Sequence, residues 1–223
     1  MTFSIVACDP DTGALGIATA TAGPMVGALV PHGRSGVGAA ATQAMTNPYL
    51  AMDTLALLAD HPAAAALRAA LARDSQAGQR QIVVVDSTGA VDGWTGAQCL
   101  PYAGHLTGSG VAVAGNTLAG PAVLDDMLAT YHRVRPDGFA PRLLRALQAG
   151  AAAGGDSRGI GSAALLVYTT QAYPDLDLRV DAADDPMAAL EQLFVLATSG
   201  SYAEFFAKAP RREADGGPVF SPS

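Results

Sequence analysis

Thr2 is the residue of this sequence whose type and position best suit nucleophilic chemistry. Removal of Met1 would leave a threonine that carries a hydroxyl nucleophile and a free α-amine on one residue. The usual pKa of such an amine is about 7.7–8.0, so it can accept and return a proton near neutral pH. The structural alternative is an ordinary strand start, because Thr2, Phe3, Ile5 and Val6 all favour β-strands.

Two further segments place polar side chains where a predicted strand ends and a helix begins. In 38–48, a strand of small residues ends in Thr42 and Gln43 and leads to Asn47-Pro48, which is typical of a helix start. A helix N-terminus favours a carboxylate or a developing oxyanion, but the structural alternative, in which Asn47 only caps its helix, is the favoured one for this residue. In 115–121, Asn116 is either a neutral donor to an oxyanion or a turn residue.

The segment 154–162 combines glycines with two opposite charges before a predicted buried strand. Gly154-Gly155 permits a positive φ or a close backbone approach. Asp156 and Arg158 could pair, orient a hydroxyl or hold a substrate carboxylate. The structural alternative is a helix C-terminal glycine followed by a surface ion pair.

An alternative nucleophile is Ser162 or Thr42, with His105 as the base. Either pair would be active with Met1 present. The one GxSxG spacing, at 155–159, follows a predicted helix and not a strand, so it is not a nucleophile elbow. The sequence contains no P-loop, and no GxGxxG follows a strand. The histidines and the two isolated cysteines lack metal-ligand spacing, so we expect neither a metal nor a cofactor.

Composition excludes several classes of partner. The net charge of −7, with Lys208 as the only lysine, argues against nucleic acid and anionic lipid. No segment reaches the roughly 18 apolar residues of a membrane span, and no secretory leader is recognisable. We therefore expect a cytoplasmic protein with a small-molecule substrate or ligand. The charged fraction of 15% is low, which is compatible with a homodimer.

The elements that must position these residues alternate between hairpins and helix pairs. We expect strands over 3–8, 14–21, 25–30, 36–42, 81–85, 90–95, 111–115, 161–169 and 176–180, with a turn at 31–34. Helices are expected over 48–59, 62–73, 121–132, 141–152 and 186–198, the last extending toward 206. Hairpins outnumber β-α-β units, which favours an α+β fold: a four-layer α-β-β-α sandwich of two antiparallel sheets. We expect one domain over 1–208 and a polar, mobile tail over 209–223.

Along nearly its whole ordered length, the chain resembles the family called domain of unknown function 1028, which is placed in the N-terminal-nucleophile hydrolase superfamily. The stretches that carry the resemblance are 2–7, 36–39, 41–44, 47–48, 95–96, 103–105, 115–120, 153–159, 162–167 and 177–181. The resemblance implies the α-β-β-α sandwich and hydrolysis of a C–N amide bond. It also implies that the mature N-terminal residue, here Thr2, attacks the carbonyl while its amine carries the proton.

These observations lead to two functional hypotheses. The first is a hydrolase of a small amide, with Thr2 as nucleophile and base, Asn116 as oxyanion donor and Asp156 as an orienting group. Its substrate contacts would come from Thr42, Gln43, Asn47, His105, Arg158 and Ser162. The second is a non-catalytic ligand-binding or assembly protein on the same fold, because a shared fold does not settle function.

Overall fold

Two antiparallel sheets form the centre of the molecule in the computed structural model, which describes residues 2–212 and 218–219. The larger sheet has the strand order β10-β9-β2-β1-β8-β7, and the smaller has the order β3-β4-β5-β6. The strands of the larger sheet are β1 (Thr2–Cys8), β2 (Leu15–Thr21), β7 (Gly104–Gly108), β8 (Val111–Asn116), β9 (Ser162–Tyr168) and β10 (Leu176–Val180). Those of the smaller sheet are β3 (Pro31–Arg34), β4 (Gly38–Ala44), β5 (Arg80–Asp86) and β6 (Val91–Thr95). The predicted α+β class with two antiparallel sheets is confirmed.

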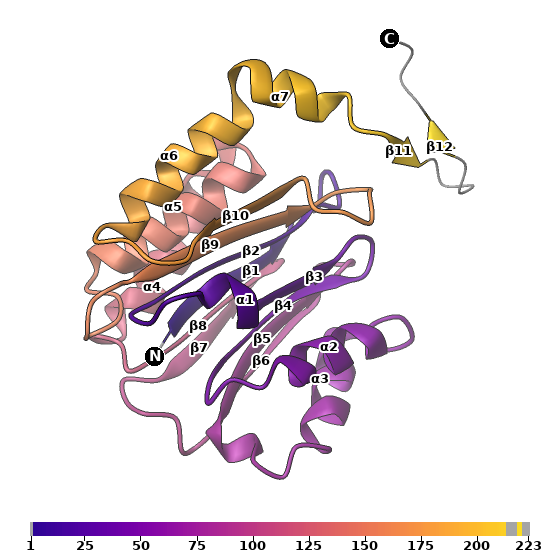
Figure 1. Ribbon diagram of the computed structural model, residues 1–223. Helices are drawn as coiled ribbons and strands as arrows, with labels where there is room; N and C mark the ends of the chain where they lie inside the picture. Colours follow the sequence, from indigo (N-terminus) through magenta and orange to yellow (C-terminus); the bar gives the residue numbers. More distant parts are fainter. Residues whose placement is uncertain (1, 213–217, 220–223) are drawn as a thin grey trace.

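Helices cover the outer face of each sheet, so the layers run helix, sheet, sheet, helix (Figure 1). The larger sheet carries α4 (Ala122–Arg133), α5 (Phe139–Ala152) and α6 (Pro186–Thr198). The smaller sheet carries α2 (Pro48–Leu57) and α3 (Ala63–Leu71). Shorter elements are α1 (Val26–Leu29), α7 (Gly200–Ala207) and the 3₁₀ turns Ala77–Gln79 and Arg135–Asp137. None of the helices in the described part of the chain has the length and hydrophobicity needed to cross a bilayer.

The core is divided by the alternation of side chains along the strands. In β1, Phe3, Ile5 and Ala7 pack against the helices of the larger sheet. Val6 and Cys8 instead point to the other sheet, where they join the apolar layer between the two sheets. β1 lies between β2 and β8, and all seven of its residues are buried, so it is the central strand of the fold.

Two of the expected elements between 25 and 42 are wrong. The predicted strand 25–30 contains helix α1, and the predicted turn 31–34 is strand β3, paired from Pro31↔Ala41 to Arg34↔Gly38. The reversal lies at 35–37 instead, where Gly36 has a φ of 68° that few residues other than glycine adopt. Strand β7 was not expected, because its five residues include two glycines and it is defined by its pairing with β8.

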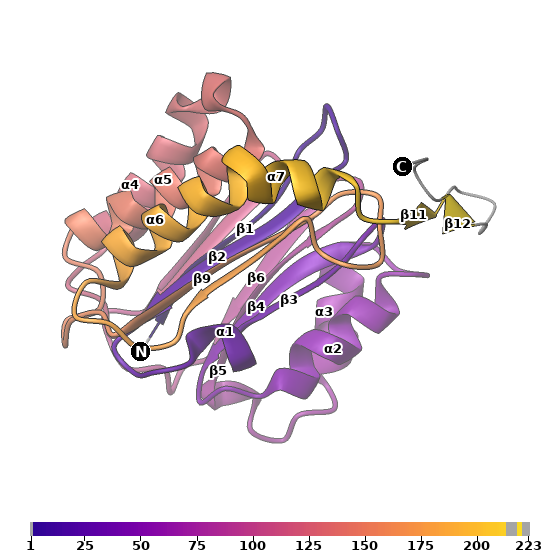
Figure 2. The same cartoon turned by 45° about the horizontal axis from the view of Figure 1, so that its top comes forward.

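Part of the C-terminal tail forms a short strand pair and contacts the loop at 171–173. Arg211–Arg212 (β11) pairs with Pro218–Val219 (β12), and both strands lie beyond the end of the sheets (Figures 1 and 2). The Tyr173 hydroxyl donates to the Pro210 carbonyl at 2.9 Å, and the backbone N–H of Arg212 donates to the Gln171 side chain at 2.7 Å. These contacts join the described part of the tail to 171–173, whereas 213–217 and 220–223 lie outside the described residues. The mobility of the tail stays a prediction.

Candidate functional site

A row of polar side chains crosses the larger sheet on the face that points to the smaller sheet. Register places Ser162 opposite Thr21 and Thr2 opposite Asn116, and the Thr2 hydroxyl donates to the Thr21 hydroxyl at 3.2 Å. These four residues therefore follow one another across β9, β2, β1 and β8. The next side chains on the same face, Ser4 on β1 and Thr19 on β2, share a hydrogen bond of 2.8 Å.

A second polar row lies on the facing side of the smaller sheet. Gln43 of β4 is paired with Gln81 of β5, which is paired with Thr95 of β6. Gln43 and Gln81 have no exposed surface. Buried amides need hydrogen-bond partners, so the two rows must meet for either to be stable.

Gln81 is the centre of the resulting network. Its Nε2 lies 3.0 and 2.8 Å from the carbonyl oxygens of Gly104 and Gly115 and 3.0 Å from Thr95 Oγ1, so its two hydrogens are shared among three acceptors. Its Oε1 accepts from Gln43 Nε2 at 2.8 Å and from Asn116 Nδ2 at 2.9 Å. The two sheets are thus joined by polar contacts at this end, whereas the rest of the layer between them is apolar.

Thr2 is fixed within this network from three sides. Its carbonyl oxygen accepts from Gln43 Nε2 at 3.2 Å, and Gln43 Oε1 accepts from the Ser4 hydroxyl at 2.6 Å. Its side chain contacts Thr21, and its neighbour across β8 is Asn116. Thr2 is 5% exposed and Asn116 is 3% exposed, so the predicted nucleophile and the predicted oxyanion donor lie side by side in a nearly dry position.

His105 joins the same network but not Ser162. Its Nδ1 lies 2.9 Å from Thr95 Oγ1, and burial lowers the pKa of the imidazole, although Asp92 opposes this shift. Three strands lie between His105 on β7 and Ser162 on β9, a separation of roughly 19 Å at normal strand spacing. Ser162 instead donates to the Gly23 carbonyl at 2.6 Å and accepts from the Val26 N–H at 3.1 Å. The structure therefore does not assemble the Ser162–His105 pair.

Thr42 and Asn47 lie away from Thr2. Strand alternation turns Thr42 to the opposite face of β4 from Gln43, where its hydroxyl donates to the Asn47 carbonyl at 3.2 Å. Asn47 caps helix α2, since its Oδ1 accepts from the Tyr49 N–H at 3.2 Å. Both contacts fit the structural alternative, and neither residue can pair with His105.

The Asp156–Arg158 loop adjoins the polar row from the other side. The predicted glycine turn is confirmed, with φ of 109° at Gly154 and 48° at Gly155. Asp156 is buried, and its carboxylate accepts from the backbone N–H groups of Ala22 and Arg158, each at 3.0 Å. Arg158 Nη2 lies 3.3 Å from the same carboxylate. Asp156 therefore fixes the chain just beyond Thr21, the partner of Thr2.

A cavity of about 170 Å³ opens beside Asn116. Its walls come from 44–45 after β4, Gln79, 98–100, 116–117 at the end of β8, and Arg158. Arg158 is the only charged residue among the described residues that line it. The cavity thus has a polar end next to the partner of Thr2.

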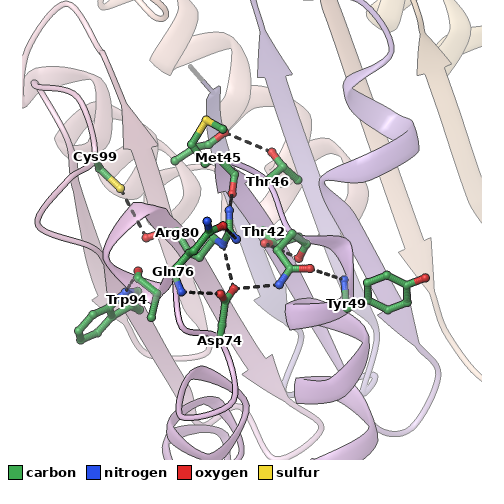
Figure 3. Close-up of polar contacts among 12 residues, drawn as sticks. Thr42, Met45, Thr46, Tyr49, Asp74, Gln76, Arg80, Trp94 and Cys99 are labelled. Carbon is green, nitrogen blue, oxygen red and sulfur yellow. Dashed lines mark hydrogen bonds and ion pairs between the residues drawn. The ribbon is translucent and has the colours of Figure 1, made fainter.

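Arg80, which follows the cavity residue Gln79 in the chain, forms an ion pair with Asp74 (Figure 3). Arg80 Nε contacts Asp74 Oδ2 at 2.8 Å, and the Arg80 guanidinium also donates to the Met45 carbonyl. Asp74 accepts from Asn47 Nδ2 at 2.9 Å, and Cys99 Sγ lies 3.4 Å from the Arg80 carbonyl. The hydrogen bond from Arg80 is the main cause that lowers the pKa of Asp74 to about 2. These contacts tie together the three segments that carry Met45, Gln79 and Cys99.

The sequence did not single out Ser4, Thr19, Thr21 or Gln81. Gln81 had one available signal, because it is a polar residue at the start of the strongest predicted strand, Gln81-Ile82-Val83-Val84-Val85. Alternation then places Gln81 on the same face as Val83 and Val85, which lie in the layer between the sheets. A glutamine on that face needs a polar partner from the other sheet.

Comparison with known proteins places most of the chain in one family, and a distant likeness is also found. The sequence model described as a family of unknown function, DUF1028, matches residues 2–190. The crystal structure of protein SPO2555 from Silicibacter pomeroyi, assigned to the same family model, is 33% identical with a TM-score of 0.91, covering 100% of this chain and 96% of that one. Anbu, the ancestral β-subunit from Yersinia bercovieri, is 11% identical with a TM-score of 0.42, covering 96% and 100%. None of the curated proteins matches the chain.

Proposed function

This chain belongs to the family of unknown function DUF1028, and we propose that it hydrolyses a C–N amide bond of a small molecule. The nucleophile is Thr2 after removal of Met1, on the α-β-β-α sandwich of N-terminal-nucleophile hydrolases. The observation that carries this proposal is the position of Thr2. It is the first residue of the central strand, paired with Asn116, which lines the cavity.

The reaction needs only groups on or beside Thr2. The free α-amine accepts the proton of Oγ1 as this oxygen attacks the amide carbonyl carbon. The C–N bond breaks, the amine returns the proton to the leaving nitrogen, and an ester to Thr2 remains. Water then attacks the ester with the amine as base, which releases a carboxylic acid and restores the Thr2 hydroxyl.

Three neighbours have supporting roles in this scheme. Asn116 Nδ2 carries two hydrogens, and one is used by Gln81, so the other can be donated to the developing oxyanion. Gln43 is a positioning residue, because it holds the Thr2 carbonyl. Asp156 is also a positioning residue. Its carboxylate accepts from the Ala22 N–H and so fixes the neighbouring Thr21, which contacts Thr2.

The test begins with the intact mass of untagged protein, which reports whether Met1 is removed. Amine release from a library of small amides is then compared among wild type, Thr2→Ser, Thr2→Ala and a form with an uncleavable N-terminal extension. We expect Thr2→Ala and the extended form to lose at least about 10³-fold in rate, with Thr2→Ser retaining activity. Thr107→Ala, a substitution at an exposed threonine of β7, is the matched control. Full activity of Thr2→Ala or of the extended form would refute the proposal.

A non-catalytic ligand-binding protein is the second candidate, and one observation favours it. Thr2 is not among the described residues that line the cavity, and its hydroxyl already has a partner in Thr21. In that case Thr2 stabilises the polar network, and a ligand occupies the cavity without reaction. Ligand binding in the absence of turnover by the Met1-free protein would distinguish this candidate from the hydrolase.

A further inference from the structure

Thr117 has an unpaired hydroxyl at the cavity beside Asn116. Its Oγ1 is buried and has no hydrogen-bond partner within the described part of the chain. Thr117 is also one of the residues that line the cavity. A buried hydroxyl without a partner is unfavourable and rare in native structures, so a polar ligand in the cavity would supply what this residue lacks.

Backbone strain is concentrated at the same cavity. Ala44 and Thr117 adopt left-handed conformations, with φ of 70° and 49°. This conformation is uncommon for residues other than glycine and is especially unfavourable for a β-branched residue such as Thr117. Ala44 directly follows Gln43, and Thr117 directly follows Asn116. Each strained residue is therefore next in the chain to a residue of the polar network. Residues in such strained conformations are found more often at active sites and ligand-binding sites than elsewhere.

Arg158 supplies a positive charge with unused donors at this cavity. Its Nε and Nη2 face the Asp156 carboxylate at 3.4 and 3.3 Å, and its Nη1 has no hydrogen-bond partner among residues 2–212. Asp156 is fully buried while the Arg158 side chain is 54% exposed. The carboxylate therefore holds the guanidinium in place, and Nη1 remains available to a ligand.

We infer that this cavity binds a small carboxylate, with the Arg158 guanidinium and the Thr117 hydroxyl as its two anchors. A guanidinium suits a carboxylate because of its charge and its several parallel donors, and no acidic residue is among the described residues lining the cavity. The volume of about 170 Å³ limits the ligand to a small molecule with a short carbon chain. Met45 and Leu100, both largely exposed at the cavity, offer contact for a short aliphatic chain. Resting on the function proposed above, this assigns the substrate as a short amide that also carries a carboxylate.

The probes are malonamate, succinamate and glutaramate, each compared with the neutral diamide of the same chain length. Binding is measured by protein NMR on full-length Thr2→Ala, which prevents turnover. We expect at least one of the three carboxylates to bind about tenfold or more tightly than its diamide. Arg158→Gln should abolish this preference. Arg145→Gln should preserve it, since Arg145 is 53% exposed, is also paired with a carboxylate and lies outside the cavity lining.

Thr117 is tested by two substitutions that separate its hydroxyl from its shape. Thr117→Val should weaken carboxylate binding several-fold, whereas Thr117→Ser should bind as wild type does, and thermal melts establish that both variants fold. Equal affinity for carboxylate and diamide, no binding of any probe, or an unchanged preference in Arg158→Gln would each overturn the inference.

The outcomes also separate this inference from the proposed hydrolase. Carboxylate binding that depends on Arg158, without amide turnover by the Met1-free protein, would support the inference and refute the hydrolase. Turnover that requires Thr2 but is unaffected by Arg158→Gln and Thr117→Val would support the hydrolase and overturn the inference.

Discussion

Replacement of Gln81 by methionine should destabilise the protein more than any single change at its surface. Methionine has a similar length, so the change removes the amide without opening a large cavity. Of the five groups bonded to the Gln81 amide, three are left with no other side-chain partner: Asn116 Nδ2 and the carbonyl oxygens of Gly104 and Gly115. Gln43 retains its bond to Thr2, and Thr95 retains its contact with His105.

The magnitude follows from those three groups. An unsatisfied buried polar group costs about 1–3 kcal/mol, and the lower end of that range gives a total of about 3 kcal/mol. Burial of the thioether offsets part of this, so we expect a net loss of at least ~2 kcal/mol in the free energy of unfolding. For a chain of this length, that corresponds to a fall in Tm of roughly 4–8 °C.

Urea unfolding followed by circular dichroism measures this difference. Gln98→Met is the matched control, because Gln98 is exposed and its side chain has no hydrogen-bond partner within the described residues. Its unfolding free energy should stay within ~0.5 kcal/mol of wild type. If Gln81→Met also stayed within that range, the argument that the two sheets depend on this network would be refuted.

Two further predictions concern the Asp74–Arg80 ion pair and a close backbone contact at Gly96. The pKa of Asp74 is about 2 in the folded protein and about 3.9 when unfolded, so its contribution to stability is present above about pH 4 and is lost as the pH falls toward 2. Urea midpoints should therefore differ between wild type and Asp74→Asn at pH 5 and converge near pH 2, and a gap independent of pH would contradict this. Gly96→Ala should lose at least ~2 kcal/mol in thermal melts, because its Cβ would lie 2.3 Å from the Gly78 carbonyl oxygen. Gly120→Ala, whose Cβ would meet nothing within 4 Å, should change stability by no more than ~0.5 kcal/mol, and equal losses in the two variants would contradict the steric argument.

Local signals predicted most of the elements and some of the site. Asn47-Pro48 indicated the start of α2. Asn47 caps that helix, which is the structural alternative predicted for this residue. Gly154-Gly155 indicated a turn with positive φ, which is present. The polar ends of strands pointed to Gln43 and Asn116, and both contact Gln81. Such signals are readable because they act over a few residues of the chain.

The same signals failed where an outcome depended on distant pairing. The pairing of Ser162 with His105 depends on where their strands lie in the sheet. Ser162 is on β9 and His105 is on β7, and three strands lie between them. Thr42 and Gln43 are adjacent in the sequence, yet strand alternation sends them to opposite faces of the smaller sheet. Gly104–Gly108 has too little hydrophobic pattern to predict a strand, and its pairing with β8 defines it.

By itself, the sequence determined the strand that begins at Thr2, the hairpin with β2, the helix starts and the net negative charge, because each depends on composition or on neighbouring residues. Only the tertiary structure decided that Thr2 lies beside Asn116, that Gln81 joins both sheets, and that Thr117 and Arg158 meet at one cavity. The physical reason is that these contacts arise from the register of strands far apart in the chain and from the packing of one sheet on the other. In that packing, buried amides must find partners across the interface.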